Sequence, residues 1–364
     1  MNEHAAALTR LLERINDARA RGVPLEIRGD GSKRFFGEAP IGDCLDMREL
    51  RGIASYEPTE LVVTARAGTA LAELEEVLRD RGQCLPFEPP RFNGQGTVGG
   101  MVAAGLAGPA RSNMGSVRDH VLGVRLLNGR GELLTFGGQV AKNVAGYAVS
   151  RLMVGAQGIL GVLCEVSIKV LPTPVATATL RFEENLGDAM RRLRMLASKP
   201  LPINASAWHE NVLHLRLAGA LAAVSEACAS LGGEEVPAND AAVWWNALRD
   251  QRHPFFLMSE PELRAGECLW RLSVPAAGDR FELPGRQLIE WHGAQRWWRT
   301  RAAAAEVRGL AAAAGGHATL VRAADKSPGV FTPLNPALLR IHRSLKEAFD
   351  PQRILNRGRL YPEL

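Results

Sequence analysis

The chain has 364 residues, of which 46% are apolar and 23% charged, a composition typical of soluble globular proteins with room for two domains. Its 44 basic and 39 acidic residues are interleaved and leave a net charge of +5, without a basic block mixed with aromatic residues, which argues against a nucleic-acid-binding protein. No apolar run reaches the length of a membrane span and no signal peptide is recognisable, so we expect a cytoplasmic protein with at most peripheral membrane association.

The first 24 residues predict a helix and then a turn toward a strand. Residues 1–22 have the pattern of an amphipathic helix that ends at Gly22. Pro24 to Arg28 then reads as a short strand that leads into the glycine-rich turn Gly29 to Lys33. Such a turn can present successive backbone N–H groups to pyrophosphate oxygens, although an ordinary tight turn fits the same residues.

The next segment predicts a strand, a helix and an extended stretch. Residues 61–67 alternate as a strand. Gly68 and Thr69 open a helix whose Leu71, Leu74 and Leu78 share one face. Leu85 to Pro90 (LPFEPP) is stiffened by proline and is expected to be extended.

A dinucleotide fingerprint is the main alternative to be weighed. Gly94 to Gly99 matches GxGxxG, and Asp119 follows about 20 residues later, as in NAD-binding Rossmann domains. That fingerprint requires a buried strand directly before it, and Pro89 and Pro90 argue against a central parallel strand. The Rossmann dehydrogenase is therefore the less favoured alternative.

The middle of the chain predicts antiparallel pairing. Two apolar runs between Val121 and Gly137 flank Asn128-Gly129, a strong hairpin signal that is foreign to a purely parallel sheet. Residues 148–154 read as a short helix, and Val162 to Leu171 as an apolar strand.

A second domain is predicted after Pro172–Pro174. All seven tryptophans lie between Trp208 and Trp298, which indicates a packed aromatic core. The alternation of strands and helices fits an antiparallel sheet with helices on one face. The predicted strands are 176–181, 212–217 and 268–274, and the predicted helices are 186–196, 220–231, 300–314 and 336–348.

Five cysteines lie far apart and form no CxxC pair. They are Cys44, Cys84, Cys164, Cys228 and Cys268. We therefore expect neither a zinc site nor an iron–sulfur cluster in this chain, and we interpret the cysteines as core residues.

Several short motifs occur in a fixed order between residues 97 and 162: TVGGMVAAGLAGP, GSVRDHVLGV, KNVAGY, RLMVG and GILGV. Together they resemble the FAD-binding domain of the vanillyl-alcohol oxidase family, also called PCMH-type flavoproteins. With LPFEPP, WHGAQRW and GGHATL, nearly the whole chain is similar to the FAD-binding subunits of bacterial glycolate oxidases within that family. The resemblance implies an α+β fold: a PCMH-type FAD-binding domain of two subdomains (1–174), an α+β cap domain (175–335), and a C-terminal segment (336–364) that returns to the FAD domain.

The resemblance also implies where FAD binds. Ser32 stands where some relatives carry a histidine bonded covalently to the flavin, so non-covalent FAD is expected. Ala148 and Gln157 replace the acidic residues usual in the family, and Arg357 replaces a proline. The positions that match the family's cofactor loops are Arg28, Gly29, Asp30, Gly31, Ser32, Lys33, Pro89, Thr97, Val98, Gly99, Gly100, Gly105, Gly108, Ser112, Gly115, Ser116, Gln157, Gly158, Ile159, Gly161, Val162 and Asn356.

Oxidation of glycolate or a related 2-hydroxy acid such as D-lactate requires a base and a carboxylate clamp. His317 is the candidate base, Arg322 the candidate clamp and Arg296 a second cation, while a structural role in a strand is the alternative for His317. The signature HxGDGNxH of many hydroxy-acid oxidising relatives does not occur in the sequence. An assembly or electron-relay role without substrate oxidation therefore stays open.

The resemblance implies two partners, a second flavin subunit and an iron–sulfur subunit. Electrons would pass through them, because this chain has no cluster ligands of its own. Trp291 to Trp298 is the candidate docking surface, with packing inside the core as the alternative.

Overall fold

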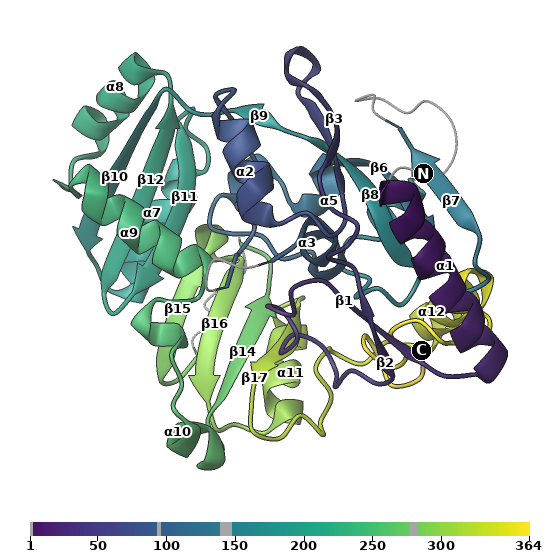
Figure 1. Ribbon diagram of the computed structural model, residues 1–364. Coiled ribbons are helices and arrows are strands. Elements are labelled where there is room, and N and C mark those ends of the chain that lie inside the picture. Colours follow the sequence, from purple (N-terminus) through teal and green to yellow (C-terminus); the bar gives the residue numbers. More distant parts are fainter. Residues whose placement is uncertain (1–2, 93–95, 139–147, 277–282) are drawn as a thin grey trace.

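The computed structural model describes residues 3–92, 96–138, 148–276 and 283–364. The residues Gly94 and Lys142 to Tyr147, which belong to two of the sequence motifs, lie outside this part of the chain. Figure 1 shows two units side by side, with an eight-stranded sheet in the unit on the left and the two chain ends in the unit on the right.

The first unit opens with a small helix–strand layer. Helix α1 (Glu3–Arg21) ends before Gly22, which has a φ of +66°, and it precedes the parallel pair β1 (Leu25–Arg28) and β2 (Asp43–Asp46). Ile15 of α1 packs in one core with Leu25 and Leu45 of the two strands, and all three are almost fully buried.

A five-stranded sheet forms the rest of this unit. Its order is β3-β4-β8-β6-β7 and all neighbours are antiparallel. Its apolar side chains share a core with helices α2 and α3, which lie beside it. The bounds are β3 (Ile53–Glu57), β4 (Val62–Arg66), α2 (Leu71–Arg79), β5 (Gln83–Cys84), α3 (Val98–Ala104), α4 (Arg111–Met114), α5 (Val117–His120), β6 (Val121–Leu127), β7 (Leu133–Gly137), α6 (Val149–Leu152), β8 (Val162–Lys169) and β9 (Leu171–Pro172).

The predicted hairpin is confirmed, but its turn is longer than two residues. Leu127 pairs with Leu133, so residues 128–132 form the loop. A Cβ atom on Gly129 would lie 2.2 Å from Oδ1 of Asp350. Gly129 is therefore required for close approach of the C-terminal segment and not for a tight type I′ turn.

The second unit is built on an eight-stranded antiparallel sheet with the order β13-β10-β12-β11-β15-β16-β14-β17. Helices α7, α8 and α11 pack on one face, whereas α9 packs on the other face, the one turned toward the first unit. The bounds are β10 (Ala176–Glu183), α7 (Leu186–Leu196), β11 (Ile203–His209), β12 (Val212–Gly219), α8 (Leu221–Leu231), β13 (Glu234–Glu235), α9 (Ala238–Arg249), η2 (Pro254–Phe256), α10 (Glu260–Arg264), β14 (Cys268–Ser273), β15 (Arg286–Glu290), η3 (Trp291–Gly293), β16 (Gln295–Thr300), α11 (Ala304–Ala313) and β17 (His317–Arg322).

Trp291, Trp297 and Trp298 are 8%, 5% and 1% exposed. The interpretation of residues 291–298 as a docking surface is therefore wrong. Trp297 and Trp298 are successive residues of β16 and point to opposite faces of the sheet, so each packs in a core. Trp291 lies in η3, where Arg111 stacks over its ring and its indole N–H donates to the carbonyl of Gly108.

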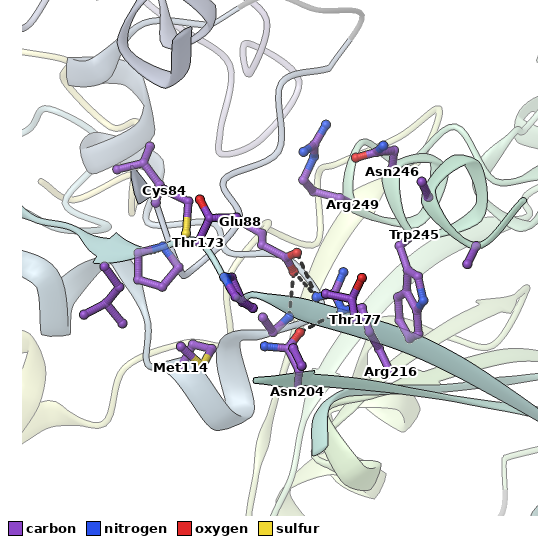
Figure 2. A pocket seen from close by; sticks show the side chains of 18 of the residues that line it. Cys84, Glu88, Met114, Thr173, Thr177, Asn204, Arg216, Trp245, Asn246 and Arg249 are labelled. Atoms are coloured by element: carbon purple, nitrogen blue, oxygen red, sulfur yellow. Dashed lines mark hydrogen bonds and ion pairs between the residues drawn. The ribbon is translucent and has the colours of Figure 1, made fainter. Parts of the chain in front are cut away.

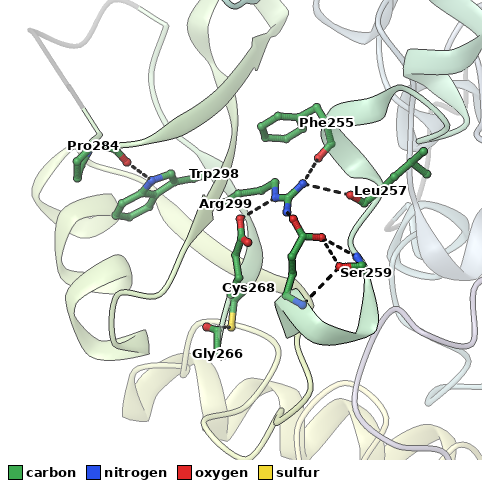
Figure 3. Close-up of polar contacts among 10 residues, drawn as sticks. Phe255, Leu257, Ser259, Gly266, Cys268, Pro284, Trp298 and Arg299 are labelled. Carbon is green, nitrogen blue, oxygen red and sulfur yellow. Dashed lines mark hydrogen bonds and ion pairs between the residues drawn. The ribbon is translucent and has the colours of Figure 1, made fainter. Parts of the chain in front are cut away.

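Arg299 shows how the helices of this unit are held to the sheet (Figure 3). Its guanidinium is buried and donates to the carboxylates of Glu262 at 2.6 Å and Glu267 at 2.8 Å. It also donates to the carbonyl oxygens of Phe255 and Leu257. One arginine of β16 thus fastens both η2 and α10.

The chain returns to the first unit through α12 (Pro336–Phe349) and the segment that follows. The backbone N–H of Leu25 donates to the carbonyl of Ile354 at 2.7 Å, and the N–H of Asn356 donates to the carbonyl of Leu25 at 3.0 Å. Across the described ranges, no helix is both long enough and apolar enough to cross a membrane.

Candidate FAD and substrate site

Two glycine-containing loops meet at the end of β1. The carboxylate of Asp30 accepts a hydrogen bond from the N–H of Gly96 at 3.0 Å. A Cβ atom on Gly29 would lie only 2.3 Å from Oγ1 of Thr97, so glycine is required there. Gly31 has a φ of +79°, which glycine adopts without strain.

The cavity between these loops contains a lysine. Lys33 lines it together with Arg28, Gly29 and Thr97. Burial lowers the pKa of Lys33 to about 8, and the negative charges of Asp30 and Asp250 act in the opposite direction. The ammonium group is thus still largely protonated at neutral pH. The ammonium group donates to Ser32 Oγ at 3.4 Å, and its remaining N–H groups can donate to a phosphate oxygen.

The opposite wall of the same cavity comes from residues far away in the sequence. Asn356 accepts from the N–H of Ile27 at 2.7 Å and donates to the carbonyl of Gln157 at 2.6 Å. Gly158 has a φ of +74°, and a Cβ atom there would lie 2.7 Å from Nδ2 of Asn356. The structure therefore brings Gln157, Gly158 and Asn356 together beside the predicted pyrophosphate loop.

Arg359 completes this wall, and the sequence analysis missed it. It lines the cavity, is 7% exposed, and donates to the carbonyl oxygens of Arg34 at 2.7 Å and Phe36 at 2.8 Å, and to that of Glu38. It thereby fixes the end of the pyrophosphate loop. The available signal was a basic residue directly after the closing motif Leu355-Asn-Arg-Gly358.

Other predicted cofactor positions lie in the packing around this cavity and are not among its lining residues. A Cβ atom on Gly99 would lie 2.8 Å from that of Ala67, and Gly105 ends α3 with a φ of +63°. Ser116 caps α5 together with Asp119, so Asp119 does not act as the ribose ligand of a dinucleotide site. Four further positions are buried or closely packed: Val98, Ile159 and Val162 are core residues, and Pro89 is buried. Helix α4 contains Ser112 and ends at Gly115. A Cβ atom on Gly161 would lie close to Leu126.

The eight-stranded sheet of the second unit is called the cap sheet from here on, and its inner face is the one turned toward the first unit. On this face, two arginines lie over neighbouring aromatic rings. Arg322 of β17 lies 4.3 Å from the ring centroid of Phe35, and Arg271 of β14 lies 5.5 Å from that of Phe36. Burial lowers the pKa of both guanidinium groups, that of Arg271 to about 10. Within the described residues the Nε atoms of both lack a hydrogen-bond partner, so both can donate to an anion.

The other two catalytic candidates are placed differently. His317 is the first residue of β17 and pairs with Ser273. The residue as a whole is exposed, but its ring is partly desolvated, and this desolvation together with the charge of Arg271 lowers its pKa. Arg296 pairs with Leu272 and Ile289 and therefore points to the outer face of the sheet. The structure thus brings Arg322 and His317 near Arg271 and separates Arg296 from them.

Glu290 at the end of β15 also faces the first unit and was not predicted. It is 4% exposed, and its Oε2 accepts from the indole N–H of Trp297 at 2.7 Å and from Gln295 at 2.9 Å. Burial raises its pKa to about 7. The available signal was its position immediately before the WHGAQRW motif.

A cavity of about 650 Å³ lies between α2 and the Leu85 to Arg91 segment on one side and α9, β10 and β12 on the other (Figure 2). Glu88 of the first unit binds Arg216 of the second unit. Its carboxylate accepts from Arg216 at 2.7 and 2.8 Å and from the N–H of Ala110 at 2.9 Å. Arg216 also donates to Asn204 and stacks over Trp245. These charges are used to hold the two units together.

Comparison with known proteins identifies the family of this chain. Residues 6–137 match the FAD binding domain family, and residues 324–360 match the C-terminal domain of FAD linked oxidases. The chain is 48% identical over 354 residues to glycolate oxidase subunit GlcE of Escherichia coli (strain K12), and the match covers 97% of each chain. The chain belongs to the GlcE family of FAD-linked oxidases.

The GlcE-family chain also resembles more distant proteins. It is 29% identical to glycolate oxidase subunit GlcD of Bacillus subtilis over 50% of this chain and 39% of that protein. The solved structure of an alkyldihydroxyacetonephosphate synthase has the same fold, with a TM-score of 0.64 and 16% identity, over 95% of this chain and 73% of that one. The expectations of a PCMH-type fold and of FAD as cofactor are confirmed, and the Rossmann alternative is wrong.

Proposed function

We propose that this chain is the FAD-binding subunit of a complex that oxidises glycolate or a related 2-hydroxy acid. The observation that carries the proposal is the 48% identity to GlcE over 97% of both chains. The matches to GlcD and to D-lactate dehydrogenase of Anaerostipes hadrus, which is 30% identical over 46% of this chain and 36% of that protein, support the same substrate class.

The residues around the first cavity fit the pyrophosphate of FAD. Gly29 and Gly31 allow close approach of the backbone, Lys33 supplies a cation, and Asn356 fixes the opposite wall. We propose that FAD is bound without a covalent link, because Ser32 offers no imidazole. The bound flavin supplies the acceptor for a hydride and its two electrons.

We propose that the substrate carboxylate binds at the inner face of the cap sheet. Arg271 and Arg322 are the clamp, because their Nε atoms are free to donate and both guanidinium groups lie against the continuation of the pyrophosphate loop. His317 stays a candidate proton acceptor at the edge of this face. Arg296 is not part of this proposal, because it points to the other face.

We propose a second flavin subunit and an iron–sulfur subunit as partners, which would take electrons toward a membrane acceptor. In the described parts of this chain, no three His, Cys, Asp or Glu side chains gather in a way that could hold a metal ion. This supports passage of electrons to another subunit. The second candidate function is an assembly or relay flavin subunit, favoured by the missing HxGDGNxH signature.

The test is the visible spectrum of the purified chain and of the co-expressed complex. We expect a yellow protein whose flavin absorbance bleaches when glycolate or D-lactate is added without oxygen. A colourless protein, or one containing FMN, would refute the cofactor assignment. Bleaching of the partner flavin subunit alone, with this chain staying oxidised, would favour the relay function.

A further inference from the structure

We propose that Glu290 is the proton-accepting group of this subunit's substrate site. The inference rests on the proposed function and names a residue that acts in it. Its basis is where the carboxyl group lies, what it contacts, and the cavity beside it.

The backbone around Glu290 is fixed to the loop that follows α3. The next residue, Trp291, donates its indole N–H to the carbonyl oxygen of Gly108 at 3.0 Å. Gly108 belongs to the loops that the resemblance assigns to the flavin. Glu290 is therefore held at a constant position relative to that loop, as a group that exchanges a proton with a bound substrate must be.

Two hydrogen bonds reach the carboxyl group from β16, and Oε2 accepts both of them. Trp297 and Gln295 donate them from β16, the neighbouring strand. They fix the plane of the carboxyl group, so we assign proton exchange to Oε1. Among the described residues no cation forms an ion pair with Glu290 within 4.0 Å, so its proton is not displaced by a permanent salt bridge.

A cavity of about 20 Å³ lies beside Glu290, between the cap sheet and the first unit. It is lined by Leu106 and Gly108 on one side and by Arg271 and Trp297 on the other. This volume holds about one water molecule or one hydroxyl group. The cavity thus leaves room for one water molecule or one substrate hydroxyl group beside the carboxyl group.

The charges that face Glu290 act in opposite directions. Arg271 of β14 favours the ionised carboxylate, and Glu88 of the Leu85 to Arg91 segment favours the protonated form. Arg249 of α9 lines the same cavity but is bound to Asp250. Burial is the largest effect and raises the pKa of Glu290 to about 7, so both protonation states are populated at neutral pH.

The proposed step moves one proton and one hydride. The hydroxyl proton of the substrate passes to Oε1 of Glu290, and FAD held at the proposed site would accept the hydride from the same carbon with its two electrons, so that a carbonyl group forms. Arg271 stabilises the substrate carboxylate and does not take a proton. Glu290 then returns the proton to water.

The test compares Glu290→Gln with the wild-type chain, each loaded with FAD, alone and within the complex. Glu13→Gln is the matched control, because Glu13 is exposed on α1. We expect anaerobic bleaching by glycolate or D-lactate to slow by about 10²-fold or more in Glu290→Gln, in the range typical for loss of an acid–base group, and to stay unchanged in Glu13→Gln. Glu290→Asp keeps a carboxyl group and is expected to recover part of the rate.

A second readout does not depend on turnover. Infrared difference spectra recorded as a function of pH should show a carboxylic acid band that titrates near neutral pH in the wild type and is missing in Glu290→Gln. A wild-type bleaching rate in Glu290→Gln would overturn the inference, and so would loss of bleaching in His317→Asn alone. If neither substrate bleaches the wild-type chain or complex, the proposed function fails, whereas failure of the inference alone requires a wild type that bleaches.

Discussion

The C-terminal segment contains a buried ion pair whose lysine also bonds the FAD-binding unit, and Lys346→Met tests what this lysine contributes. Lys346 and Asp350 are both 0% exposed. The ammonium group donates to Asp350 Oδ2 at 2.7 Å, to the carbonyl of Ile159 at 2.7 Å and to the carbonyl of Leu355 at 2.8 Å. Methionine fills similar space but cannot replace these three bonds.

The expected loss is large because the substitution leaves a buried carboxylate without its cation. Asp350 keeps the N–H groups of Ile354 and Leu355 as donors. The carbonyl groups of Ile159 and Leu355 lose a charged donor. Breaking a buried pair in this way typically lowers the free energy of unfolding by about 3–5 kcal/mol. Because Ile159 follows Gly158, FAD affinity should fall as well.

The assay is urea unfolding followed by far-ultraviolet circular dichroism, which reports on both units, with FAD binding to the apoprotein measured in parallel. The matched control is Arg21→Met, which removes the exposed pair between Arg21 and Asp17 with the same i,i+4 spacing. Its expected effect is below about 1 kcal/mol. Equal losses in the two variants would refute the reasoning. The double variant Lys346→Met/Asp350→Asn should lose less than Lys346→Met alone, because it removes the unpaired charge.

Four further outcomes are expected. Burial raises the pKa of Glu290 from 4.5 to about 7, so the stability of the folded wild type falls as pH rises between these values. Glu290→Gln should be more stable than wild type by about 3 kcal/mol at pH 8 and equal to it below about pH 4, in urea titrations at both pH values. Arg216→Met leaves Glu88 half-buried without its cation and should speed proteolysis at residues 172–175 by weakening contact between the units. Gly158→Val should lose visible flavin absorbance while far-ultraviolet circular dichroism is retained, because a Cβ atom would displace Asn356; normal flavin content would count against the site. Acid precipitation should release FAD into the supernatant, and flavin in the pellet would contradict non-covalent binding.

The sequence predicted elements well where the signal is local. The periodic segments became α1, α7 and α12, close to the expected bounds. Strands β15 and β16 were missed because residues 286–300 mix arginine and tryptophan without regular alternation, and a strand at β17 was considered only as the alternative role of His317. Arg299 can be buried in β16 only because Glu262 and Glu267 approach it from elsewhere in the chain, and that compensation is invisible in a linear pattern.

Whether the signal is local in the sequence also explains which site residues were predicted. Glycine loops such as Gly29 to Gly31 are recognisable by composition, because close backbone approach requires glycine. Arg359 directly follows the closing motif, but its role depends on carbonyl groups more than 300 residues earlier in the chain, and the motif does not reveal those partners. Arg296 of β16 was selected and Arg271 of β14 was not, because the sequence does not fix the face to which each strand residue points. A shift of one residue along a strand moves a side chain to the other face of the sheet.

The cavity assigned to the pyrophosphate is assembled from both ends of the chain. Lys33 lies on its N-terminal wall, while Asn356 and Arg359 contribute the wall that comes last in the sequence. Because Asn356 bonds Ile27 and Gln157, and Arg359 bonds the carbonyl groups after Lys33, neither loop has its final geometry until the C-terminal segment has docked. The cap lies between these two segments in the sequence. A complete pyrophosphate site therefore requires that the chain continue past the cap to Asn356 and Arg359.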